Sequence, residues 1–163
     1  MATNAQSAWE NAELRCYEYL VAVLESEEGV TAHLGELPIT ITDDSEAEMW
    51  MFKIDGGGEL LQINAAQRPR CCWEMTAAFN GIFTERDRAQ RVAGKVMDSL
   101  PAKTGNVPTG YPGLTGVQKF DLAGNPTLDR SLIHMKTSTE QGGEIRVWLL
   151  TIPLIVAFNN TTI

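Results

Sequence analysis

The sequence has few of the side chains that bind metals or form disulfides. Its 163 residues include three cysteines and two histidines. Cys71 and Cys72 are neighbours and Cys16 lies far from them, a spacing that fits neither a zinc site nor the disulfide framework of a secreted protein. Because neighbouring side chains on a strand point to opposite faces, we expect one core cysteine and one surface or interface cysteine in this pair. These residues predict no metal, no cofactor and a reducing compartment.

Motifs of catalytic and phosphate-binding sites are missing as well. The chain has no Gly-x-Ser-x-Gly nucleophile elbow and no glycine loop followed by Gly-Lys-Ser/Thr. His33 falls in a segment that we interpret as a loop and His134 in a strand candidate, and neither belongs to a cluster with metal-ligand spacing. The acidic run at 43–46 is interpreted as a solvated turn in preference to a cation site. We therefore expect a protein that is not an enzyme.

Basic residues are outnumbered by acidic ones. Thirteen Lys and Arg stand against 21 Asp and Glu, which gives a formal net charge of -8 and a pI near 4.7. Binding to the phosphates of nucleic acid needs clustered Lys and Arg, so this balance argues against a protein that grips nucleic acid. An acidic surface does suit a channel through which DNA slides without sticking, because like charges repel.

Long uninterrupted apolar runs are absent. Residues 147–158 form an apolar run, but Thr151 and Pro153 interrupt it and it is shorter than a membrane span. Residues 1–20 contain several charged side chains and therefore lack the apolar centre of a signal peptide. We expect no membrane partner.

The chain contains enough apolar residues to form one hydrophobic core. With 44% hydrophobic residues, residues 1–163 are predicted to form a single α+β domain, ending in a short polar tail at 159–163. A first amphipathic helix is predicted over residues 7–24. Its apolar positions recur at helical spacing: Trp9, Ala12, Cys16, Leu20, Val23 and Leu24.

A hairpin is predicted after this helix. Residues 37–42 and 47–54 are interpreted as strands, the second with Trp50, Phe52 and Ile54 on one face. Asp55 and the glycines at 56–58 predict a turn, and residues 60–64 are interpreted as the return strand of that hairpin.

The second half begins with a strand and a helix. Residues 70–79 alternate between two faces, one of which carries Cys71, Trp73, Met75, Ala77 and Phe79. The helix that follows is predicted to begin at Thr84, whose side chain caps it with Asp87 three residues on. Its apolar stripe consists of Ala89, Val92, Val96 and Leu100, while Arg86, Arg91, Lys95 and Asp98 are expected to face water.

A Pro- and Gly-rich loop and three strands complete the chain. The loop covers 101–116, and a loop of this length is more often functional than a mere connector. Strands are predicted at 117–122, 131–137 and 144–158, and the last is unusually long. A strand of that length suggests projection from the core toward a partner. The fold class is therefore α+β, with a mostly antiparallel sheet and two main helices packed on it.

Several large residues are candidates for subunit contacts. Both faces of the last strand are apolar, with Trp148 and Leu150 on one of them. Trp50 on the hairpin and Tyr111 in the loop are further candidates, because aromatic residues are enriched in interface cores. Gly57 marks the hairpin turn and Thr104 the loop. For Trp50 and Trp148, the alternative that they belong to the monomer core is equally open.

The order of these elements resembles the tail terminator proteins of long-tailed bacteriophages and related tail-completion proteins. The segments that match are Cys71-Cys72-Trp73-Glu74-Met75, the helix at 87–100 with Arg91-Val92, Gly116-Val117-Gln118 and Ile145-Arg146-Val147-Trp148-Leu149. The resemblance covers most of the chain as a pattern of elements, and the loop at 103–114 and the glycine turn at 56–58 depart from it.

The resemblance implies a structural virion protein of the tail or neck, assembled in the host cytoplasm. It implies a homohexameric ring at the head-proximal end of the tail tube, which stops tube growth, contacts the tail tube protein and joins the tail to the head–tail connector or stopper. DNA would pass through the channel without specific binding, and we expect a negative lumen. Two alternatives stay open: another head–tail joining, neck or tube protein, and a small α+β enzyme or ligand-binding domain that uses the loop as a lid.

Overall fold

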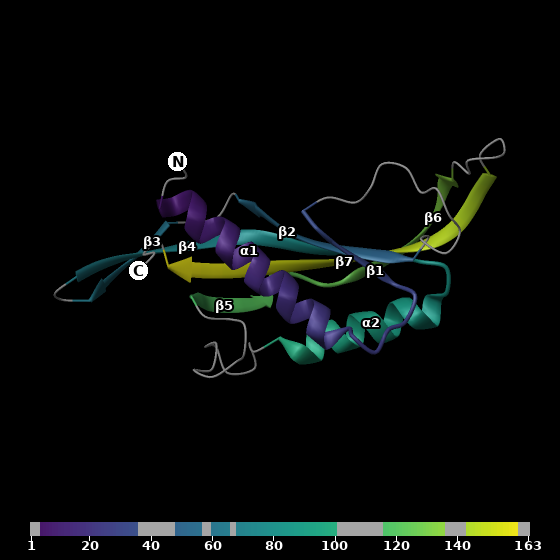
Figure 1. The fold of residues 1–163 in the computed structure, drawn as a ribbon, viewed down its shortest axis with the longest axis horizontal. Helices are drawn as coiled ribbons and strands as arrows, with labels where there is room; N and C mark the ends of the chain where they lie inside the picture. The colour runs from purple at the N-terminus through teal and green to yellow at the C-terminus, as the bar shows by residue number, and fades with distance from the viewer. Residues whose placement is uncertain are drawn as a thin grey trace.

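A computed structural model describes residues 4–35, 48–56, 60–65, 68–100, 116–135 and 143–159. These residues form a single α+β domain, in which two helices pack on a mixed, mostly antiparallel open sheet (Figure 1). This confirms the fold class predicted from the sequence. The elements in chain order are α1 (Asn4–Val23), β1 (Thr31–Leu34), β2 (Met49–Gly56), β3 (Leu60–Ala65), β4 (Arg68–Phe83), α2 (Arg86–Ser99), β5 (Val117–Leu122), β6 (Thr127–Met135) and β7 (Gly143–Asn159).

Two long central strands organise the sheet. β4 and β7 are antiparallel and pair from Cys72 opposite Asn159 to Phe83 opposite Trp148. The sheet order is β1-β2-β4-β7-β5, and β1 and β2 form a parallel pair. β3 pairs with β4 beyond the end of β2, and β6 pairs with β7 beyond the end of β5. The last strand therefore pairs with β4 along one edge and with β6 and then β5 along the other.

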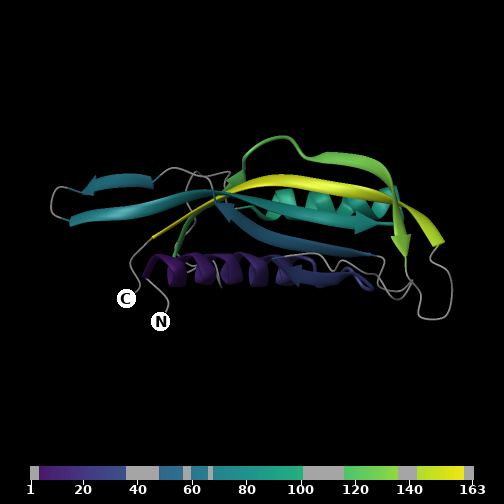
Figure 2. The same ribbon diagram turned by 90° about the horizontal axis from the view of Figure 1, so that it is seen from above.

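The offset between β4 and β7 produces two projections. The start of β4 extends past β7 and pairs with β3, whereas the start of β7 extends past β4 and pairs with β6. Because β4 and β7 run in opposite directions, these two hairpin-like arms lie at opposite ends of the molecule (Figures 1 and 2). We call them the β3–β4 arm and the β6–β7 arm.

The helices bury one face of the sheet. Every fourth residue of α1 is buried, namely Ala8, Ala12, Cys16 and Leu20, as is Leu24 directly after the helix, and α2 buries Ala89, Val92, Ala93 and Val96. These positions share one core with the alternate sheet residues Phe52, Phe79 and Ile152. A period of nearly four residues in the helices and of two in the strands brings these apolar faces together.

Two of the predicted connections are wrong. The segment around His33, interpreted as a loop, contains β1, because Thr31 to Leu34 pair in parallel with Met49 to Phe52. β3 is not the return strand of a hairpin with β2, since Leu60 to Ala65 pair with β4. In addition, β2 continues through Asp55 to Gly56, where the predicted turn begins. Each of these pairings is set by a remote strand, which local composition does not identify.

The predicted cap of α2 is also wrong. Glu85 is the residue before the helix, and it makes no capping hydrogen bond with its side chain. Thr84 instead donates a hydrogen bond to the carboxylate of Glu48, 2.6 Å away. β6 begins at Thr127, four residues before the predicted start. The predicted strand at 37–42, the acidic turn at 43–46, residues 101–115 of the loop and the tail at 160–163 lie outside the described residues.

Candidate interaction surface

The β6–β7 arm carries a group of arginines on the face that the helices cover elsewhere in the sheet. Trp148 pairs with Phe83 of β4 on one side and with Arg130 of β6 on the other. Because paired residues share a face, Arg130 and Trp148 lie on the side of Phe83, which belongs to the helix-covered core. This face of the arm therefore continues the core surface beyond the helices.

Trp148 is half-buried and has two arginines over its ring. The Cζ atoms of Arg86 and Arg130 each lie 5.7 Å from the ring centroid. Arg86 is the first residue of α2, so a helix start and an edge strand meet at this tryptophan. Cation–π contacts of this kind contribute about 0.5–1 kcal/mol at exposed sites. They hold two guanidinium groups at the base of the arm.

The arm continues outward with an apolar and a third basic residue. Leu132 pairs with Arg146, two positions beyond the pair of Arg130 and Trp148, so all four share one face. Leu132 is 55% exposed, and Arg130 and Arg146 are exposed. Arg130, Ser131, Leu132 and Arg146 border an open hollow of about 510 Å³. We call Arg130, Leu132 and Arg146 the arm face.

The arm face is basic on a chain with a net charge of -8. Within the ranges that the structure describes, neither Arg130 nor Arg146 forms an ion pair. Arg86 is flanked in sequence by Glu85 and Asp87, and the register places Glu144, opposite His134, on the same face as Arg146, two positions earlier in β7. Two exposed arginines around an exposed leucine are suited to contact an acidic surface with an apolar centre.

The candidate residues from the sequence fall into three groups. Trp50 is 2% exposed and stacks on Phe79, with 5.2 Å between ring centroids, and Leu150 is also 2% exposed. Both lie in the core of the chain. For Trp50 this is the alternative left open above, that it belongs to the monomer core. Trp148 lies at the edge of the core and borders the arm face. Gly57, Thr104 and Tyr111 lie outside the described residues.

The arm face was not among the residues predicted from the sequence. A signal for it is present, because Leu128, Arg130 and Leu132 alternate with Asp129 and Ser131. The strand predicted at 131–137 begins after most of this alternation. The position of Arg146 on the same face depends on the register between β6 and β7, which requires the structure.

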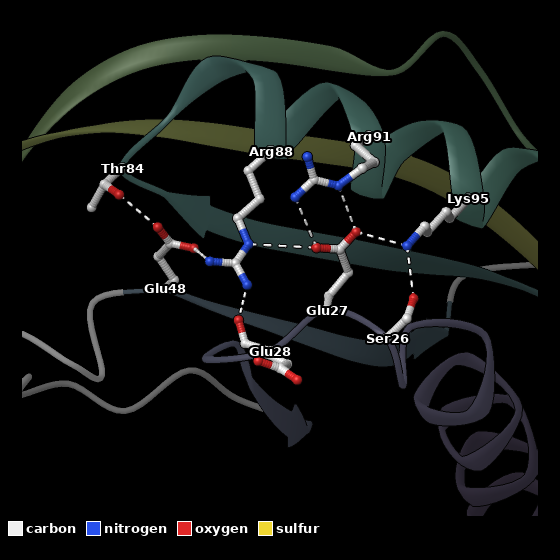
Figure 3. A network of polar contacts seen from close by, with 8 residues as sticks. All are labelled: Ser26, Glu27, Glu28, Glu48, Thr84, Arg88, Arg91 and Lys95. Carbon is white, nitrogen blue, oxygen red and sulfur yellow. Dashed lines mark hydrogen bonds and ion pairs between the residues drawn. The ribbon is translucent and has the colours of Figure 1, made fainter.

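A charged network fixes the helix that carries Arg86. Glu27, in the turn after α1, has a side chain that is 5% exposed and accepts hydrogen bonds from Arg91 at 2.8 and 3.0 Å and from Lys95 at 2.8 Å (Figure 3). Hydrogen bonds from Arg91 outweigh burial and lower the pKa of Glu27 from 4.5 to about 2. Arg91 was expected to face water and its side chain is 53% exposed, but it and the less exposed Lys95 also pair with this carboxylate.

Arg88 extends the network to the sheet. It donates to the backbone carbonyl of Glu28, and its Nη1 atom lies 2.7 Å from the carboxylate of Glu48, next to the start of β2 (Figure 3). Glu48 in turn accepts the hydrogen bond of Thr84. The turn after α1, the start of β2 and the exposed side of α2 are thus joined by one set of polar contacts, so the network has a structural role in positioning α2.

The described residues contain no group of three or more His, Cys, Asp and Glu side chains arranged to hold a metal ion. Cys16 is fully buried in the core, and burial, with a smaller contribution from Glu13, raises the pKa of its thiol far above the usual range. His33 lies in β1. Cys71 and Cys72 lie in β4 and His134 lies in β6.

Comparisons with known proteins do not assign a family. No protein-family model matches the chain, and none of the curated proteins compared with it is similar to it. In the part of the chain that the structure describes, neither helix is long and apolar enough to cross a membrane.

Proposed function

We propose that this chain is a structural virion protein, a tail terminator that assembles into a homo-oligomeric ring at the head-proximal end of a bacteriophage tail tube. The ring, of six subunits in the family that the sequence resembles, ends tube growth and joins the tail to the head connector. The observation that carries this proposal is the pair of arms at opposite ends of the sheet.

Opposed arms suit a closed ring. A cyclic assembly needs two different surfaces on each subunit, because every subunit contacts one neighbour with one surface and the other neighbour with the second. Among the described strands, β3 and β6 each pair on one side only. Strand edges and arm faces beyond the core are available for such contacts, whereas a compact monomer would gain little from them.

The charge of the chain supports the same proposal. A net charge of -8 suits a channel that lets DNA pass, because an acidic lumen repels phosphate. Part of the basic charge gathers on the arm face, where it is available to a neighbouring subunit. A ring with a basic lumen would contradict the proposed passage of DNA.

Native mass spectrometry and negative-stain microscopy at several protein concentrations, with and without tail tubes, test the proposal. We expect a single closed ring, or a monomer that becomes a ring on tail tubes. Long hollow cylinders would identify a tube protein instead. A chain that stays monomeric at every concentration and does not bind tail tubes would overturn the proposal and favour an enzyme or ligand-binding domain.

A further inference from the structure

We propose that the arm face of one copy of this chain docks on the outer surface of α1 in the next copy. The inference rests on the proposed ring, and it assigns the two surfaces that form its repeating contact. The partner is a second copy of the chain because the surface that complements the arm face is present on the chain itself.

The outer surface of α1 has the composition that the arm face requires. Its exposed residues include Leu14, Glu18 and Val21, and Glu25 is exposed in the turn that follows the helix; we call these four residues the α1 stripe. Leu14 is 40% exposed and Val21 39%. Arg15 is the one basic residue on this surface of α1, and Glu10 lies on it as well. The stripe is thus acidic with apolar side chains between the charges.

The spacing of the charges also corresponds. Glu18 lies five residues before the end of α1 at Val23, about 7.5 Å along the helix axis, and Glu25 lies in the turn two residues beyond that end. Arg130 and Arg146 are diagonal neighbours across β6 and β7, with Cα atoms about 7–8 Å apart. The long arginine side chains can adjust to the spacing of the two glutamates.

Apolar residues adjoin the charges on both surfaces. Val21 lies between Glu18 and Glu25 in the sequence, and Leu132 lies opposite Arg146 and two residues from Arg130. Docking therefore joins two arginine–glutamate pairs around a contact between Leu132 and Val21. Specific interfaces usually have apolar contacts at the centre and polar or charged residues around them.

The two surfaces cannot meet within one copy. α1 crosses the helix-covered side of the sheet, while the arm face lies beyond it at the end where β6 and the start of β7 project (Figures 1 and 2). The contact is accordingly head-to-tail, from the arm of one copy to the helix of the next. Repetition of a head-to-tail contact closes a ring when the rotation between copies permits it.

A charge swap tests the contact. One variant carries Arg130→Glu and Arg146→Glu, and the other carries Glu18→Arg and Glu25→Arg. We expect each variant alone to lose the ring under the conditions in which the wild type forms it, because like charges then face each other at every contact. We expect an equimolar mixture to regain the ring with strictly alternating copies, which native mass spectrometry detects as equal numbers of the two masses.

Controls separate this result from misfolding. Thr127→Glu adds a negative charge to β6 outside the arm, on the opposite face of the sheet, and should leave the ring intact. Thermal unfolding of each variant checks that the fold persists. As a second measurement, Val21→Cys and Leu132→Cys are combined in a chain with Cys71→Ser and Cys72→Ser. Oxidation by copper phenanthroline should then link different copies into covalent multimers.

Distinct outcomes address the inference and the proposed function. A wild-type ring that survives both charge reversals, with no cross-linking, would overturn the inference and leave the ring standing. Duplex DNA binding is measured for the wild type and for the variant with Arg130→Glu and Arg146→Glu. If the wild type binds DNA and this variant keeps its ring but loses DNA binding, the arm face binds nucleic acid and the inference is overturned. A wild-type chain that never forms a ring would overturn the proposed function together with the inference.

Discussion

The guanidinium of Arg91 donates two hydrogen bonds to the carboxylate of Glu27, with Nε 2.8 Å from one oxygen and Nη2 3.0 Å from the other. The two residues come from α2 and from the turn after α1, 64 positions apart in the chain. A paired, two-point contact of this kind is stronger than a single neutral hydrogen bond. It couples the two helices that cover the sheet.

Glu27→Gln should lower the stability of the fold. The amide keeps the shape of the side chain but removes its charge, which leaves Arg91 and Lys95 without their ionic partner. Because these two cations are partly exposed and regain water, we expect a loss of about 1–3 kcal/mol in the free energy of unfolding. Urea unfolding measures it.

Glu28→Gln is the matched control for this substitution. Glu28 follows Glu27 directly, its side chain is exposed and it contributes its backbone carbonyl to the network, so its replacement should change the free energy of unfolding by less than about 0.5 kcal/mol. Equal losses in the two variants would show that the network does not stabilise the chain.

The stabilisation by Glu27 should depend on pH. The pKa of Glu27 in the folded chain is about 2, below its ordinary value of 4.5, so folding favours the ionised carboxylate. Its contribution is complete above pH 4.5 and is lost as the pH falls toward 2. The difference in free energy of unfolding between the wild type and Glu27→Gln should therefore be constant from pH 5 to 7 and shrink below pH 4.5. A difference that is the same at pH 3 and pH 6 would contradict this assignment.

Cys16 should not react with thiol reagents while the chain is folded. Its side chain is fully buried, and burial raises the pKa of the thiol, so little thiolate forms near neutral pH. Alkylation followed by trypsin digestion and mass spectrometry separates this residue from Cys71 and Cys72, because cleavage follows Arg15 and Arg70. We expect modification of Cys16 only in denaturant. Rapid labelling of Cys16 in buffer would show that this part of the core opens.

Gly81→Ala should destabilise the sheet. Gly81 is buried in β4 between Trp50 and Leu150, and a Cβ atom there would overlap the ring of Phe83. Overpacking of this kind costs about 1–3 kcal/mol. Calorimetric unfolding should show a lower melting temperature.

Gly94→Ala provides the opposite expectation in the same assay. Gly94 lies in α2, and no atom is within 4 Å of the position of an added Cβ. Alanine in a helix is favoured over glycine by about 0.5–1 kcal/mol, so this variant should be more stable than the wild type. An equal effect of the two substitutions would contradict the packing described around Gly81.

The sequence by itself determined both helices and most of the strands, though not β1 or the start of β6, and it determined which of their faces are apolar. The stripe of Ala89, Val92 and Val96 and the alternation of Trp50, Phe52 and Ile54 indicated buried faces that the structure has. These properties follow from the periods of helix and strand, which neighbouring residues express without any remote partner. The mostly antiparallel α+β class follows from the same patterns.

Only the tertiary structure decided which strands pair and which charges meet. β3 pairs with β4 and not with β2, although its apolar pattern suits either neighbour. Glu27 meets Arg91 and Lys95, and Arg146 shares a face with Arg130, only after helix docking and the register of β6 on β7 are set. Pairing and charge contacts join residues that are remote in the chain, so local periodicity does not encode the choice among chemically similar partners.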